Sequence, residues 1–160
     1  MTDRYLAYRK HVEQLGIDEI MEYSVSSAKL ILRIFDAYLV KNPESEISFF
    51  KDKFTLTVMD MELFGKGDLT KQSEIHKGFG ELLGCVEPFY KNPFIDFGVS
   101  VIFDLMRLVV PTVDYLKTTR EKKPYDGAAY FYFRVNENYM SYVTRFGWLC
   151  QEWNKLKKDL

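Results

Sequence analysis

Apolar residues recur at intervals of three and four positions through most of the chain, which is the spacing of one face of an α-helix. The longest early example covers residues 17–42. Its apolar side carries Met21, Ala28, Ile31, Phe35 and Tyr38, and its polar side carries Glu22, Ser26, Lys29, Arg33 and Asp36. This helix should end before Pro43, because the residue that precedes a proline is disfavoured in the helical conformation. The same spacing predicts further helices over residues 5–15, 69–90, 94–121 and 127–158.

Residues 45–64 permit two interpretations. Helical spacing relates Ile47, Phe50, Phe54, Val58 and Met61, whereas the segment FTLTV at residues 54–58 alternates as in a short β-strand. No second strand with suitable turn residues is evident nearby, so we predict a helix here as well.

The last predicted helix has a continuous apolar seam. Steps of three and four alternate along Tyr132, Val135, Tyr139, Tyr142, Phe146, Leu149, Trp153 and Leu156. This is the a/d pattern by which one helix buries a face against another. We therefore predict an all-α fold, with residues 1–160 forming a single domain of five to six helices. The last two helices, 94–121 and 127–158, should close it as a long antiparallel helical hairpin.

The opposite side of the last helix suggests an interface. That side contains Phe131 and Trp148, two large apolar residues that do not belong on a solvated face, together with Arg134 and Arg145. Either a second neighbouring helix or a loop covers them, or they bind another protein, since Trp and Arg are enriched at the centres of interfaces. We predict an interface formed by Phe131, Arg134, Arg145 and Trp148.

Two features of the middle helices bear on packing. The outer face of the helix at 94–121 should carry Asp96, Ser100, Asp104, Arg107 and Asp114, and Pro111 on that face predicts a kink. In the helix at 69–90, Gly78, Gly80 and Gly84 weaken helix formation. They indicate either close packing by a neighbouring helix or a pliable segment near a ligand.

Composition and charge narrow the class of protein. Hydrophobic residues make up 47% of the chain and charged residues 28%, which is typical of a globular protein. The 22 basic and 23 acidic residues leave a net charge of -1, so no field attracts nucleic acid. No uncharged apolar stretch reaches the roughly 18–20 residues that a membrane span needs. Two cysteines and no recognisable signal peptide lead us to expect a cytoplasmic protein.

Motifs for catalysis or cofactor binding are weak. Neither His11 nor His76 follows a Glu by three residues, as a helical metal site would require, so we predict no metal and no cofactor. Cys85 and His76 lie nine residues apart in one predicted helix, where their side chains cannot meet. The GKG segment at 65–67 lacks the rest of a phosphate-binding loop.

These observations favour a non-enzymatic helical interaction or regulatory protein of the inhibitor, immunity or adaptor type. Its partner would be another protein or a second copy of itself, with homodimerisation possible. The alternative is a globin-like sensor domain without haem, in which an apolar small molecule such as a fatty acid binds and the last two helices dimerise. That alternative depends on analogy of fold alone.

Overall fold

The computed structural model describes residues 3–85, 92–118, 124–125 and 127–146. All regular structure in these residues is helical. The elements are α1 (Asp3–Gln14), α2 (Ile17–Lys41), α3 (Ile47–Gly65), a 3₁₀ turn η1 (Leu69–Lys71), α4 (Gln72–Gly84), α5 (Pro93–Thr118) and α6 (Ala128–Phe146). This confirms the prediction of an all-α fold, and the six α-helices of the described residues agree with the expected number.

Local chemistry explains the limits of α2. At its start, the Glu19 carboxylate accepts a hydrogen bond from the backbone N–H of Gly16 at 3.5 Å. At its end, both the backbone and the side-chain amide of Asn42 donate to the carbonyl of Tyr38, at 2.9 and 3.1 Å. Pro43 follows directly and prevents continuation. The helix therefore ends within one residue of the predicted position.

The segment at 54–58, which could be read as a strand, lies in the middle of α3. A strand would place Phe54, Leu56 and Val58 on one face, but Phe54 and Val58 are buried while Leu56 points to solvent. The β-branched threonines adapt to the helix because the hydroxyls of Thr55 and Thr57 donate to carbonyl groups one turn earlier. The helix prediction is confirmed.

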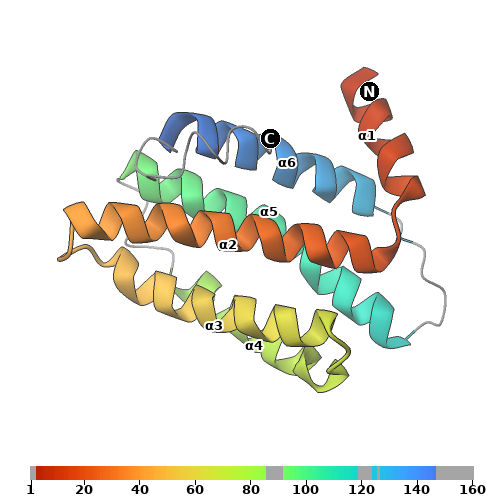
Figure 1. Ribbon diagram of the computed structural model, residues 1–160, viewed down its shortest axis with the longest axis horizontal. Helices are drawn as coiled ribbons and strands as arrows, with labels where there is room; N and C mark the ends of the chain where they lie inside the picture. The colour runs from red at the N-terminus through yellow and green to blue at the C-terminus, as the bar shows by residue number, and fades with distance from the viewer. Residues whose placement is uncertain (1–2, 86–91, 119–123, 126, 147–160) are drawn as a thin grey trace.

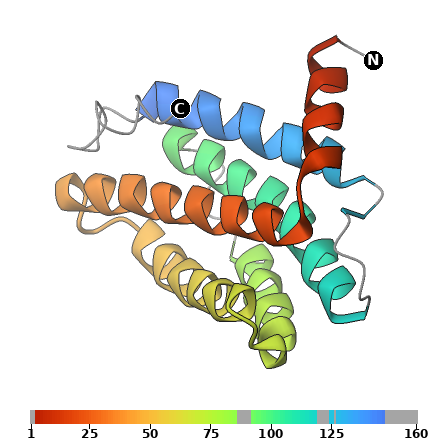
Figure 2. The same cartoon turned by 45° about the vertical axis from the view of Figure 1, so that its right-hand side comes forward.

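Helices α5 and α6 lie side by side and run in opposite directions. The ring of Phe94, at the start of α5, lies 5.1 Å from that of Phe146, at the end of α6. In Figure 1, α5 passes behind α2, α6 lies above α2, and α3 and α4 lie together below it. Helix α1 stands at a steep angle to α2, beside the end of the molecule where α6 begins (Figure 2).

One hydrophobic cluster takes buried residues from all six helices. Its aromatic centre includes Phe35 of α2, Phe94 of α5 and Tyr142 of α6, with ring centroids 5.7–6.5 Å apart. Gly98 of α5 permits this contact, because a β-carbon there would lie 2.7 Å from Cε1 of Phe35. The three helices can thus approach closely at this point.

The apolar seam of α6 is buried from Tyr132 to Tyr142, and Phe146 beyond it is half-buried. Tyr132, Val135, Tyr139 and Tyr142 all lie in the core, as the sequence predicted. The predicted continuation of this helix to residue 158, with Leu149, Trp153 and Leu156, lies outside the described residues. Helix α5 runs through Pro111 without a break.

Candidate functional site

The predicted interface on α6 is only partly free. Phe131 is half-buried against the core and meets Tyr130 edge to face at 5.3 Å. Arg145 is exposed, but its guanidinium lies over the rings of Phe97 and Phe146 at 5.7 and 5.6 Å. Trp148 lies outside the described residues. The fourth predicted residue, Arg134, faces an acidic group of α5.

That acidic group is Asp104, and the prediction that it lies on a solvated face is wrong. Asp104 was expected on the solvated face of its helix, yet it is only 2% exposed. Its carboxylate accepts a hydrogen bond from Arg107 at 3.1 Å and one from the Asn138 amide, and it lies 3.7 Å from Nε of Arg134. A buried carboxylate is tolerated because opposite charges and donors surround it. The expected outer face of α5 is therefore covered here by α6.

A small cleft of about 260 Å³ opens above Asp104, lined by Asp96, Ser100, Asp104, Arg107, Arg134 and Asn138 among others. The positive charges of Arg107 and Arg134 equal in number the negative charges of Asp96 and Asp104 in this cleft. Each arginine points toward Asp104, so the polar groups join α5 to α6 and fix the register between them.

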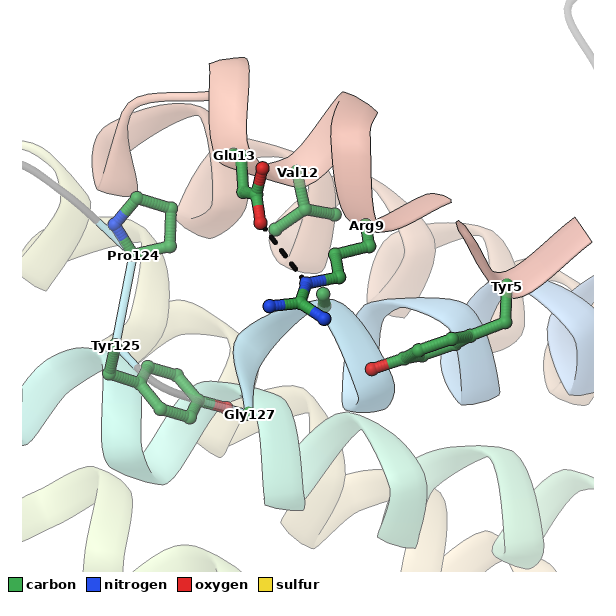
Figure 3. A pocket seen from close by; sticks show the side chains of 8 residues that line it. Tyr5, Arg9, Val12, Glu13, Pro124, Tyr125 and Gly127 are labelled. Carbon is green, nitrogen blue, oxygen red and sulfur yellow. Dashed lines mark hydrogen bonds and ion pairs between the residues drawn. The ribbon is translucent and has the colours of Figure 1, made fainter. Parts of the chain in front are cut away.

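A larger cleft, of about 470 Å³, lies between α1 and the segment that leads into α6. Figure 3 shows Arg9 and Glu13 in its wall, joined by a hydrogen bond of 3.1 Å, with Tyr5 and Tyr125 on opposite sides. The lining combines a charged pair with aromatic rings. A pocket for a fatty acid is predominantly apolar, so this lining does not favour the predicted apolar ligand.

A polar network beside this cleft attaches α1 to α2 and α6. The Tyr23 hydroxyl donates to Asn136 at 3.2 Å, the Asn136 amide donates to the Tyr8 hydroxyl, and the Tyr23 ring stacks on Tyr132 at 4.4 Å. Burial raises the pKa of the Tyr23 phenol well above its usual range. Asn136 thus links the hydroxyls of Tyr8 and Tyr23, whereas the buried hydroxyl of Tyr142 has no hydrogen-bond partner among the described residues.

Four large apolar side chains are exposed on one face of helix α3. Phe49, Leu56, Met59 and Leu63 are 60%, 62%, 53% and 42% exposed. We call these four residues the apolar row. They are spaced by seven, three and four positions and so lie on one side of the helix. The opposite side, with Phe50, Phe54 and Met61, is fully buried, so α3 is apolar on two faces.

Ion pairs flank the apolar row on both sides. Toward α2, Lys51 lies 2.8 Å from Asp36, and Glu62 pairs with Lys29. The Lys29 hydrogen bond lowers the pKa of the Glu62 carboxyl. Toward α4 and η1, Lys53 lies 3.1 Å from Glu81, and Asp60 lies 3.8 Å from Lys71. The flanking charges of α3 are thus neutralised within the protein, while the row between them remains open.

The apolar row was not predicted from the sequence. The signal was present, because Phe49, Leu56 and Leu63 repeat at seven-residue intervals beside the core-facing series. Periodicity alone does not show which of two apolar faces a neighbouring helix covers. In the structure α2 and α4 cover one face of α3 and leave the other to solvent.

The candidate reactive residues are not gathered in one pocket. Nε2 of His76 lies 2.6 Å from Oδ1 of Asp114, which also accepts a hydrogen bond from Gln72 at 2.6 Å. Both His76 and Asp114 are close to half exposed, and Cys85 caps the far end of α4. Within the described residues no group of three or more His, Cys, Asp or Glu could hold a metal ion, and no helix is long and apolar enough to cross a membrane.

Comparison with known proteins found no match to a protein-family model, to a curated protein or to a solved structure. The apolar row of α3 is the strongest candidate site, because the ion pairs Arg9–Glu13 and Arg107–Asp104 already satisfy each other in the two clefts described above.

Proposed function

We propose that this protein is a non-enzymatic interaction module, of the inhibitor, immunity or adaptor type, that binds a helix of another polypeptide chain through the apolar row of α3. The observation that carries this proposal is the exposure of four large apolar side chains on one face of one helix. Contiguous apolar patches of a few hundred Å² on a protein surface commonly mark interaction sites.

The spacing of the row suits a helical partner. Anchors separated by three, four and seven positions are those by which one helix packs against another. From Phe49 to Leu63 the row extends for roughly 21 Å at 1.5 Å per residue. The partner would therefore present about four helical turns. The ion pairs on either side would form a polar rim around this contact.

Site-specific photo-crosslinking tests the proposal. A benzophenone amino acid would replace Leu56 in the apolar row, and in a separate variant it would replace Tyr130 of α6, which is also exposed. Irradiation of cells that make the protein should give a discrete protein adduct from position 56 and none from position 130. An adduct from position 130 alone would contradict the proposal and favour the predicted α6 interface.

The interface predicted on α6 remains a second possibility of the same class. Arg145 borders an open cleft on α6 that Phe97, Met140 and Thr144 also line. The closing hairpin, with its second helix continued to residue 158, likewise remains a prediction. The sensor alternative gains no specific support from the cleft beside α1, because an Arg9–Glu13 ion pair lies in its wall.

A further inference from the structure

We infer that a second copy of this chain occupies the apolar row, with the two α3 helices packed antiparallel. This inference rests on the proposed function, because it uses the same surface. It adds the identity of the partner and the orientation in which that partner binds. Two charged residues on the same helix face support it, Asp52 within the row and Lys66 just beyond it.

The exposed face of α3 forms a regular series. Steps of three and four connect Phe49, Asp52, Leu56, Met59, Leu63 and Lys66. Lys66 follows the last residue of α3 and keeps helical backbone angles, so it belongs to the same series. Asp52 and Lys66 are both exposed, and neither forms an ion pair with another described residue. The exposed face thus carries one acid near its start and one base just beyond its end, and the charge of Lys66 also acts on the Glu62 carboxyl.

Antiparallel packing of two such helices is self-complementary. With the two-fold axis between residues 57 and 58, Leu56 faces Met59 of the second copy and Met59 faces Leu56 of the second copy. In heptad terms, Leu56 is an a position and Met59 a d position. Each a position then meets a d position of the second copy, as knobs-into-holes packing requires. Leu63 lies opposite Asp52 of the second copy, and Phe49 lies opposite Lys66. Every contact occurs twice, as in any isologous interface.

The charges select this orientation. In the antiparallel pair, Asp52 lies one helical turn from Lys66 of the second copy, so opposite charges meet at both ends. In a parallel pair, Asp52 would meet Asp52 and Lys66 would meet Lys66. Like charges placed together across an interface suppress that arrangement. The apolar side chains supply the attraction, and the two charges determine its direction.

The surroundings of the row do not oppose self-association. Identical surfaces always repel when they carry a net charge, but the charges beside this row are already paired, as Lys51 with Asp36 and Lys53 with Glu81. The opposite charges of Asp52 and Lys66 also sum to zero. A single helix pair covers less than the roughly 800 Å² per partner of a standard interface, so we expect a weak dimer with a dissociation constant on the order of 10 µM.

Charge exchange between the two positions tests the inference. Sedimentation velocity, over concentrations on either side of the expected constant, would compare the wild type with Asp52→Lys and Lys66→Asp. Each single variant brings like charges together at both ends, so each should dimerise roughly tenfold more weakly. An equimolar mixture of the two variants should form a heterodimer, because one chain then has a basic side chain at both positions and the other chain has an acidic side chain at both.

Several outcomes would overturn the inference. A wild type that stays monomeric at all concentrations would do so, as would single variants that dimerise like the wild type or a mixture that does not associate. Leu56→Asp serves as a control that should abolish any association through the row, and circular dichroism would verify that each variant is folded. A monomeric wild type that still gives an adduct with a different protein from position 56 would reject the dimer and retain the proposed function.

Discussion

At the scale of single residues, two glycines in α4 have different roles. A β-carbon on Gly78 would collide with the side chain of Thr57 in α3, whereas a β-carbon on Gly80 would meet nothing within 4 Å. Gly78 therefore allows α3 and α4 to approach closely, which is one of the two interpretations that the sequence left open. Gly80 has no such role and only weakens the helix.

This difference gives a matched pair of substitutions. Gly78→Ala should lower the free energy of unfolding by about 1–3 kcal/mol, because the added methyl group overpacks the contact with Thr57. Gly80→Ala should raise it by about 0.5–1 kcal/mol, because alanine is the better helix former. Urea denaturation followed by circular dichroism measures both. Equal effects of the two substitutions would contradict the close packing at Gly78.

At the scale of helices, α5 and α6 are joined by polar groups as well as by their apolar seams. Asp104 is the centre of this contact, since Arg107, Arg134 and Asn138 all direct nitrogen atoms toward its carboxylate. Charge-assisted hydrogen bonds of this kind are stronger than neutral ones and depend on geometry. These directional contacts favour one axial register between the two helices. Apolar contacts alone would discriminate less between neighbouring registers.

Removal of this carboxylate should therefore be costly. We expect Asp104→Ala to lower the free energy of unfolding by about 1–3 kcal/mol, because it leaves the Asn138 amide and two guanidinium groups without their acceptor. Asp96→Ala, on the same helix and beside the same cleft, should change it by no more than about 0.5 kcal/mol. Thermal denaturation of the two variants provides the measurement. Similar losses for both would show that the Asp104 contacts contribute little.

At the scale of the whole molecule, buried tyrosines connect the helices. Burial raises the pKa of Tyr23, Tyr125, Tyr132, Tyr139 and Tyr142, and that of Tyr139 reaches about 12. A phenol near pKa 10 in the unfolded chain holds its proton more tightly in the folded protein. The resulting stabilisation is complete below pH 10 and is lost as the pH rises through 10 toward the folded values.

Alkaline titration should therefore couple tyrosine ionisation to unfolding. The buried tyrosines should ionise only above pH 10, together with the loss of helical structure. Ultraviolet absorbance of tyrosinate and circular dichroism, recorded on the same samples, would show whether the two changes coincide. If all eleven tyrosines ionised in one step near pH 10 in a protein that stayed helical, the described burial would be wrong.

The sequence by itself determined that the protein is helical and where several of its helices lie. The limits of α2, the helical state of residues 54–58 and the buried seam from Tyr132 to Tyr142 were all predicted and confirmed. These features follow from local rules, because a periodicity of 3.6 residues, a proline or a capping side chain acts within one or two turns of the chain.

Only the tertiary structure decided which helix faces are covered. The sequence predicted Asp104 on a solvated face, but α6 covers it in the folded protein. The helical spacing of α3 predicted a buried face, but it did not show that a second apolar face stays exposed. Periodicity divides a helix into faces, but burial depends on neighbours that are distant in sequence, such as Asn138 beside Asp104. The candidate binding surface of this protein is for that reason a property of its packing.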